Sequence, residues 1–131
     1  MQASLLYSHC AQAIARFYHG LDQRDNESLL ACLEADTVWV RQGKTLKGPE
    51  QILEALDQRD PQRVTSHQVS NLYIKLLEDG VMANVIYYLT VYDNQHSTSG
   101  LQLKTILRSE DVFRLRNGAW VLSSKQSHKH L

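Results

Sequence analysis

Residues 81–92 read VMANVIYYLTVY and residues 101–120 read LQLKTILRSEDVFRLRNGAW. Both stretches are rich in the β-branched and aromatic residues that favour strands, so they predict long strands over residues 81–92 and 101–116. Asn117-Gly118 is the strongest short hairpin signal in the chain, and residues 119–124 then return alongside as a further strand. The C-terminal half is therefore predicted to form an antiparallel meander.

The strand over residues 81–92 is apolar on both of its faces. Val85 and Leu89 fall on one face, while Ile86 and Tyr88 fall on the other. An antiparallel sheet with one face in water alternates more cleanly than this. We therefore expect helices to cover one face and a second copy of the protein to cover the other, giving a homodimer through the sheet.

Another strand-like segment, at residues 69–77, leads into this meander through the turn Glu78-Asp79-Gly80. Ahead of it, Gly48-Pro49-Glu50 is typical of a helix start, because proline suits the first helical position and glutamate suits the positive end of the helix dipole. Pro61 ends that helix, which is predicted over residues 49–59.

The first 40 residues predict two further helices and a strand. Apolar residues recur at helical spacing in the first segment, at Tyr7, Cys10, Ile14, Phe17, Tyr18 and Leu21. Asp25 or Asn26 is a natural N-cap for a short second helix with a leucine face. Thr37 to Val40 reads as the first strand. The fold class predicted is thus α+β, with N-terminal helices packed on a curved antiparallel sheet.

Length and composition limit the classes of function. The chain has 131 residues, 43% of them hydrophobic and 21% charged, which suits one globular domain over residues 1–131. Its 14 basic and 14 acidic side chains cancel, so no electrostatic feature predicts nucleic acid or a membrane as partner. Cys10 and Cys32 both fall in segments that read as helix, and with no signal peptide they are expected to be buried thiols in the cytoplasm.

The order of these elements resembles the cone-shaped fold of the nuclear transport factor 2 (NTF2-like) superfamily, and more narrowly the SnoaL-like proteins. The resemblance covers nearly the whole chain and depends on the order and spacing of several short motifs. These are Phe17-Tyr18 with Gly20-Leu21-Asp22 and Asp25, Val38-Trp39, Lys47-Gly48-Pro49-Glu50-Gln51-Ile52, His67 with Asn71, and Asp111-Val112-Phe113-Arg114 leading to Asn117-Gly118-Ala119-Trp120.

The resemblance implies a deep, mostly apolar pocket between the sheet and the first helix, and usually a dimer. The superfamily includes polyketide cyclases, ketosteroid isomerases, dehydratases and dioxygenase small subunits, so the fold alone selects no activity. The chain departs from its relatives at two places. Ser66 stands before His67 where an arginine is common, and the last strand has Ser124-Lys125-Gln126 where relatives are rich in arginine.

His67 and Asp111 are the candidate catalytic residues. The resemblance places His67 at the pocket, where an imidazole shuttles protons near neutral pH, and Asp111 on the paired strand would orient it. Two alternatives stay open. His67 is equally a histidine with a purely structural hydrogen bond. Glu110-Asp111 equally forms a solvated bulge, or pairs with Arg108 or Arg114 on the surface.

Aromatic side chains are the candidate ligand-binding residues, because they offer a flat apolar surface with a polar tip. We assign Tyr18, Trp39, Tyr88 and Phe113 to this group. The alternative is an aromatic core or dimer interface. Tyr87 and Tyr88 must point to opposite faces of their strand, and the sequence does not show which one faces the pocket.

The histidines lack the companions of a zinc site, and the chain has no phosphate loop or nucleotide motif, so neither a metal nor a cofactor is expected. Two hypotheses follow. One is a cofactor-independent isomerase, cyclase or dehydratase that acts on a small hydrophobic or aromatic molecule, with His67, Asp111 and a tyrosine at the site. The other is a non-catalytic module that binds an apolar ligand or serves in assembly.

Overall fold

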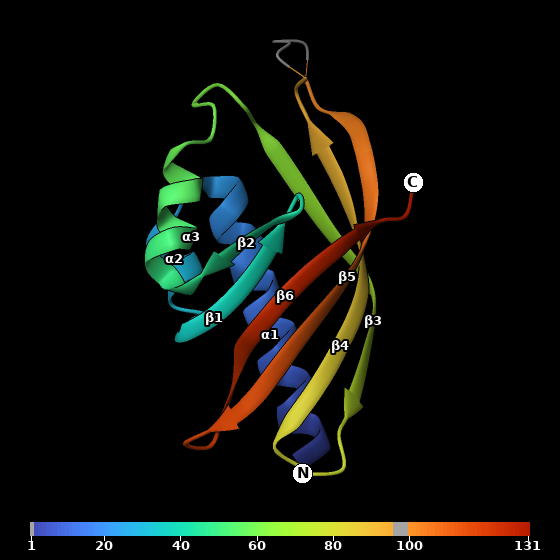
Figure 1. The fold of residues 1–131 in the computed structure, drawn as a ribbon. Helices are drawn as coiled ribbons and strands as arrows, with labels where there is room; N and C mark the ends of the chain where they lie inside the picture. Colours follow the sequence, from blue (N-terminus) through green and yellow to red (C-terminus); the bar gives the residue numbers. More distant parts are fainter. Residues whose placement is uncertain (1, 96–99) are drawn as a thin grey trace.

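A computed structural model describes residues 2–95 and 100–131, with side chains from residue 5 onward (Figure 1). Three helices and six strands follow in the order α1 (Gln2–Gln23), α2 (Asn26–Leu30), β1 (Leu33–Arg41), β2 (Lys44–Lys47), α3 (Gly48–Asp57), β3 (Thr65–Leu76), β4 (Met82–Asp93), β5 (Gln102–Arg116) and β6 (Ala119–Lys129). The predicted α+β class, with helices preceding a long-stranded meander, is confirmed.

The strands form one curved sheet in the order β2-β1-β6-β5-β4-β3. Neighbours are antiparallel except β1 and β6, which run parallel. Two predicted elements have other bounds in the structure: β1 extends beyond the predicted residues 37–40 at both ends, and α3 ends at Asp57, two residues before its predicted end. There are three further differences. β2 was not predicted, β3 begins at Thr65 instead of residue 69, and β6 continues to Lys129 instead of ending at residue 124. The last two differences bring His67 and Lys125 into regular strands.

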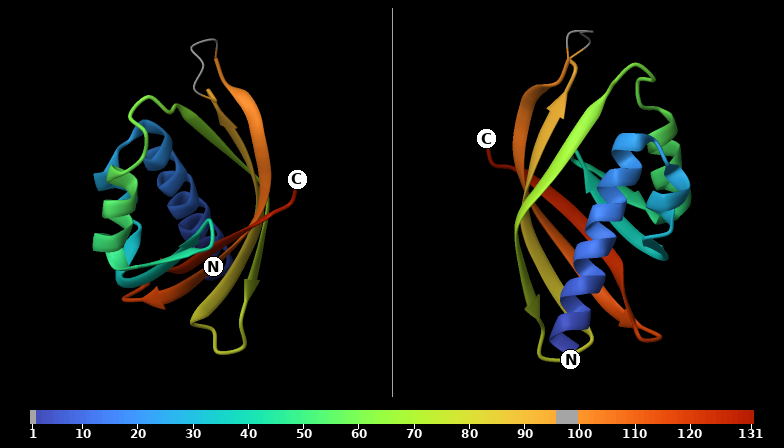
Figure 2. Two further views of the ribbon diagram at one scale, coloured as in Figure 1. Left: turned by 45° about the horizontal axis from the view of Figure 1, so that its top comes forward. Right: turned by 180° about the vertical axis from the view of Figure 1, so that it is seen from behind.

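α1 lies diagonally across the concave side of the sheet (Figure 2). Its buried stripe runs through Cys10, Ile14, Phe17, Tyr18 and Leu21, as the helical spacing predicted. Tyr7, which was assigned to the same stripe, is 54% exposed, whereas its neighbour Leu6 is buried.

The shorter helices sit beyond α1, beside β1 and β2 (Figure 1). Asp25 caps α2 by accepting a hydrogen bond from the Ser28 backbone N–H at 3.2 Å, as predicted. Gly48 opens α3 with a φ of +80°, and an added Cβ there would lie 2.9 Å from the Ala35 carbonyl oxygen. The Gly-Pro start therefore depends on a conformation and a close approach that suit glycine alone.

The two cysteines are free and buried, as expected. Cys10 lies in α1. The prediction that Cys32 is helical is wrong, because α2 ends at Leu30 and the Cys32 backbone N–H closes the following turn onto Leu29. None of the helices in the described part of the chain is long and apolar enough to cross a membrane.

β4 alternates between a buried face and a half-buried face along its whole length. Ala83, Val85 and Tyr87 are completely buried on the concave face under α1. Tyr88 lies on the opposite, convex face, which no helix covers (Figure 2). The alternation resolves which of the two adjacent tyrosines points inward, and it is Tyr87.

Candidate active site

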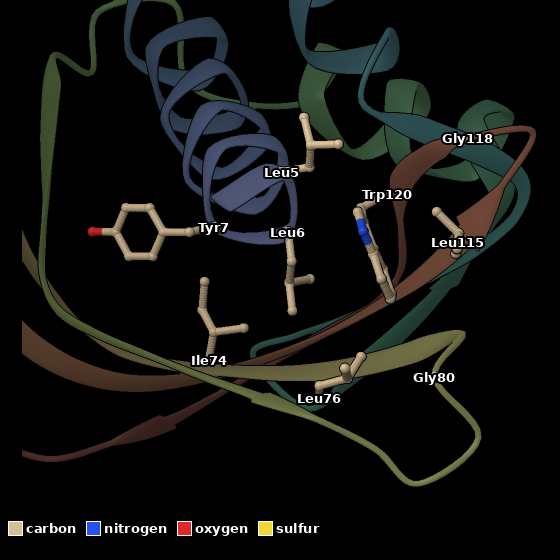
Figure 3. A pocket seen from close by; sticks show the side chains of 9 residues that line it. All are labelled: Leu5, Leu6, Tyr7, Ile74, Leu76, Gly80, Leu115, Gly118 and Trp120. Carbon is tan, nitrogen blue, oxygen red and sulfur yellow. The ribbon is translucent and has the colours of Figure 1, made fainter. Parts of the chain in front are cut away.

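Two of the cavities that the described residues form lie at opposite ends of α1, and they differ in chemistry. The larger, of about 680 Å³, lies at the first turn of α1 and is lined mainly by carbon atoms of residues such as Leu6, Ile74 and Trp120 (Figure 3). Its one titratable lining group is the exposed Tyr7 phenol. It therefore offers apolar surface but no acid or base at neutral pH.

The second cavity, of about 450 Å³, lies at the other end of α1 and has the size of a small-molecule site. Tyr18, Trp39, Leu89 and Val91 form part of an apolar wall. His67 faces the same space from the start of β3. This cavity combines an apolar surface with an imidazole, a side chain able to accept or donate a proton, so it is the candidate active site.

His67 is held by Asp22 from the last turn of α1. Its Nδ1 lies 2.5 Å from the Asp22 Oδ1, and its backbone N–H donates to Oδ2 of the same carboxylate at 2.8 Å. An ionised carboxylate only accepts hydrogen bonds, so the proton of the neutral imidazole belongs on Nδ1. Nε2 then carries the lone pair, and it has no hydrogen-bond partner among the described residues.

The local structure fixes this carboxylate firmly. Thr65 Oγ1 also donates to Asp22 Oδ1 at 2.8 Å. The carboxylate is therefore hydrogen-bonded to two residues at the start of β3, Thr65 and His67. Burial acts to raise the pKa of Asp22, but the hydrogen bonds from His67 and Thr65 and the attraction of the imidazole outweigh it, and the pKa is lowered. Asp22 therefore stays ionised and orients the imidazole across the neutral pH range.

Behind the cavity wall lies a fully buried polar cluster built around Lys125 from β6. Its Nζ donates to Asp111 Oδ2 at 2.7 Å, to Tyr87 Oη at 2.6 Å and to Tyr18 Oη at 3.0 Å. The Lys125 and Asp111 side chains are 1% and 0% exposed. A charge so deeply buried persists only with a partner of opposite charge and further hydrogen bonds, and both are present here.

The titration of this cluster follows from its burial. Burial raises the pKa of Asp111, and the neighbouring Lys125 ammonium offsets the rise in part. Burial acts to lower the pKa of Lys125, but the Asp111 charge and the hydrogen bonds to Asp111 and Tyr18 outweigh it and raise that pKa, so the ammonium is retained. Burial and the Asp111 charge raise the pKa of Tyr87 well above its ordinary value, which keeps that phenol protonated.

Tyr18 is the member of the buried cluster whose hydroxyl hydrogen is least committed to an acceptor. Lys125 has three N–H hydrogens, and its three acceptors use them. The Tyr87 hydroxyl donates to Asp111 at 2.9 Å. Among the described residues, the hydroxyl hydrogen of Tyr18 has one acceptor within reach, the Tyr87 oxygen at 3.1 Å, and that oxygen already accepts a hydrogen bond from Lys125. Tyr18 also lines the cavity and stacks on the His67 ring, with centroids 5.4 Å apart.

The structure places the predicted site residues in different surroundings. His67, Tyr18 and Trp39 line the cavity together. Asp111 lies in the buried cluster, so the prediction that it orients His67 is wrong; Asp22 occupies that place. Asp111 is also neither solvated nor paired with Arg108 or Arg114, but its neighbour Glu110 does pair with Arg108, so the alternative holds for Glu110 and is wrong for Asp111.

The two remaining predicted ligand residues do not line this cavity. Phe113 is completely buried in the core under α1. Tyr88 lies on the convex face with its ring centroid 4.9 Å from that of His130. Among the described residues, no three histidine, cysteine, aspartate or glutamate side chains are placed to hold a metal ion together.

The fold and the cavity define an NTF2-like α+β domain, and residues 2–126 match the SnoaL-like domain family, to which the chain belongs. The resemblance seen in the sequence motifs is thereby confirmed. No curated protein sequence matches the chain.

Solved structures of the same fold share little sequence with it. A type 2 hexachlorocyclohexane dehydrochlorinase (LinA) is 19% identical with a TM-score of 0.87, over 99% of this chain and 88% of that one. ActVI-ORFA from Streptomyces coelicolor is 18% identical with a TM-score of 0.81, over 95% and 98%. A cystatin-like-fold protein of unknown function from Nostoc punctiforme is 24% identical with a TM-score of 0.79, over 94% and 90%. At these identities the likeness shows the fold alone.

Proposed function

We propose that the protein is a cofactor-independent enzyme that moves a proton on a small hydrophobic or aromatic carbonyl compound. His67 acts as the general base through Nε2, and Asp22 is the residue that positions it. Tyr18 donates a hydrogen bond to the oxygen on which negative charge develops. The observation that carries the proposal is the arrangement of the two ring nitrogens of His67. Nε2 has no partner in the described part of the chain and lies at the cavity wall, while Nδ1 lies 2.5 Å from the Asp22 carboxylate.

The chemistry begins with a carbon–hydrogen bond next to the carbonyl group. Nε2 of His67 takes the proton, the bonding electrons move into a new carbon–carbon double bond, and the carbonyl oxygen becomes an enolate oxygen. The enolate then takes the proton back from the His67 imidazolium at the far end of a conjugated double bond, expels from the neighbouring carbon a leaving group that takes this proton, or attacks a second carbonyl within the molecule, whose oxygen takes it. These three outcomes are an isomerisation, an elimination and a cyclisation.

The buried cluster supports the step that generates the enolate. Charge developing on the substrate oxygen is stabilised best by a donor that is already oriented before the reaction. The Lys125 ammonium donates onto the Tyr18 oxygen at 3.0 Å, so the phenol dipole lies in the field of a buried positive charge. Asp22 in turn stabilises the imidazolium that forms when Nε2 accepts the proton.

Deuterium exchange tests the proposal without knowledge of the natural substrate. Aromatic and polyketide-like ketones, including 2-tetralone, are incubated with the protein in heavy water, and loss of the α-proton signal is followed by proton NMR. We expect the wild type to accelerate exchange of at least one ketone, and His67→Gln to lose roughly a hundredfold or more of that acceleration. Equal rates for wild type and His67→Gln across the panel would contradict catalysis by His67.

A non-catalytic ligand-binding module is the second candidate, and one observation favours it. Asp22 accepts hydrogen bonds from the His67 backbone and from Thr65 as well as contacting the ring, so the pair also fastens α1 to β3. In that case His67→Gln binds the same ketones with unchanged affinity, and neither protein exchanges their protons above the buffer rate.

The uncovered convex face supports the further proposal of a homodimer through the sheet. Tyr73 is 61% exposed there, and Ile86 and Tyr88 are half-buried in β4 beside it. Analytical ultracentrifugation is expected to show a dimer that Tyr73→Arg weakens. A monomer at all concentrations of the wild type would remove this proposal and leave the proposed chemistry untouched.

A further inference from the structure

The candidate active site is bordered by an excess of positive charge. Five basic side chains line the 450 Å³ cavity, namely Arg41, Arg59, Arg63, Lys104 and Lys129, and no acidic side chain of the described residues lines it. A low-dielectric cleft bordered by charge of one sign concentrates ligands of the opposite sign.

Carboxylates of the protein neutralise only part of this positive charge. Asp93 lies 3.4 Å from both the Arg63 Nε and the Lys104 Nζ, so one carboxylate serves two cations. Asp22 is close enough to raise the pKa of Arg59, yet burial and the neighbouring arginines lower that pKa to about 10. The cluster is therefore short of negative charge when the cavity holds no ligand.

Unused donors lie among these arginines. The Nε atom of Arg59 is buried without a hydrogen-bond partner among the described residues, and the Nε atom of Arg63 has only its ion-pair contact with Asp93 at 3.4 Å. The Arg41 side chain makes no hydrogen bond or ion pair with the other described residues. Its guanidinium stacks over Trp39, with Cζ 5.4 Å from the ring centroid. A half-buried guanidinium that meets only an aromatic face has lost water on one side without gaining an acceptor.

We infer that the substrate or ligand is an amphipathic carboxylate: its aromatic or alicyclic body lies against Tyr18, Trp39 and Leu89, and its carboxylate lies among Arg41, Arg59 and Arg63. The planar fork of a guanidinium matches a carboxylate in two parallel hydrogen bonds, which explains why the basic lining is mainly arginine. The inference rests on the same cavity as the proposed function and deepens it by naming the class of molecule bound there.

Isothermal titration calorimetry with a matched pair of probes tests this inference. 2-Naphthoate and 2-naphthylmethanol share one ring system and differ in the carboxylate. We expect the wild type to bind the carboxylate roughly tenfold or more tightly than the alcohol. Arg41→Gln should remove most of that preference, and the folded state of this variant is expected to persist because Arg41 has no polar partner to lose.

Arg108→Gln is the matched control, because it makes the same change of charge on the convex face, where Arg108 pairs with Glu110. It should keep the full preference. Binding of both probes with equal affinity, binding of neither up to their solubility limits, or an unchanged preference in Arg41→Gln would each overturn the inference.

His67→Gln separates this inference from the proposed function. A carboxylate preference that persists in His67→Gln, together with no proton exchange by the wild type, removes the catalytic proposal and supports the inference. Exchange that depends on His67 but comes with no carboxylate preference supports the catalytic proposal and removes the inference.

Discussion

Lys125→Met is the perturbation whose outcome follows most directly from the contacts in the structure. Methionine keeps most of the length and apolar stem of lysine but removes the ammonium. Asp111 then loses its partner at 2.7 Å while its side chain stays 0% exposed, and the Tyr18 and Tyr87 oxygens lose a shared donor. The variant therefore leaves a carboxylate deep in the core without a compensating charge.

The expected cost is large for one substitution. Removing one member of a buried ion pair destabilises a protein by about 3–5 kcal/mol. For a domain of this size each kcal/mol lowers Tm by roughly 3–5 °C, so Tm should fall by roughly 10–25 °C. The loss depends on pH, because burial already raises the pKa of Asp111 with Lys125 present. A group whose folded pKa is raised contributes stability at low pH and loses it as pH rises through that pKa, so the deficit of Lys125→Met grows with rising pH.

Thermal denaturation followed by circular dichroism measures this loss. Lys75→Met, an exposed change of the same kind in β3, is the control and should shift Tm by no more than a degree or two. The double variant Lys125→Met/Asp111→Leu should be more stable than Lys125→Met alone, because the orphaned charge is gone. A Tm within two degrees of the wild type for Lys125→Met, or a double variant less stable than either single one, would refute the reasoning.

Three further outcomes are expected. Asp22→Asn should cost about 1–2 kcal/mol of unfolding free energy at pH 7 in urea titrations, and because the pKa of Asp22 is lowered by folding, this difference should disappear as pH falls below about 4. Gly48→Ala should destabilise more than Gly43→Ala, since both have positive φ but only the first places a Cβ 2.9 Å from the oxygen of Ala35; equal losses would contradict the steric explanation. Burial and the nearby Asp111 raise the pKa of the Cys10 thiol to about 12, so iodoacetamide at pH 8 should alkylate it only after unfolding, as mass spectrometry would show.

Local signals explain how much of the fold could be predicted from the sequence. The Asn117-Gly118 turn, the Gly48-Pro49 helix start and the Asp25 cap each act over a few residues, and each appears where it was predicted. The short strand β2 was missed because Lys44-Thr-Leu-Lys47 offers one apolar residue and no alternation. Its position is decided by pairing with β1 and not by its own composition.

The candidate site was harder to predict because its partners are distant in sequence. Asp22 contacts His67, which lies 45 positions later in the sequence, and the residues around Asp22 are typical of the polar end of a helix. The pairing of Asp111 with Lys125 depends on a register shift between Val112 and Phe113. Counted from the Asn117-Gly118 turn without that shift, Asp111 would face Ser124, so no pattern in the sequence marks Lys125 as a core residue.

One signal in the sequence did point toward the cluster. Successive residues of a strand face opposite sides of the sheet, so either Glu110 or Asp111 in β5 had to face inward. The structure buries Asp111 and exposes Glu110.

The central claim is that Asp22 holds the proton of His67 on Nδ1 and leaves Nε2 free toward the cavity. Long-range proton–nitrogen correlation NMR of the ¹⁵N-labelled protein reads the protonation of both ring nitrogens at pH 8. The account predicts that Nδ1 carries the proton and Nε2 does not, and that Asp22→Asn shifts the population toward the other tautomer. A His67 ring with its proton on Nε2 in the wild type would contradict the account.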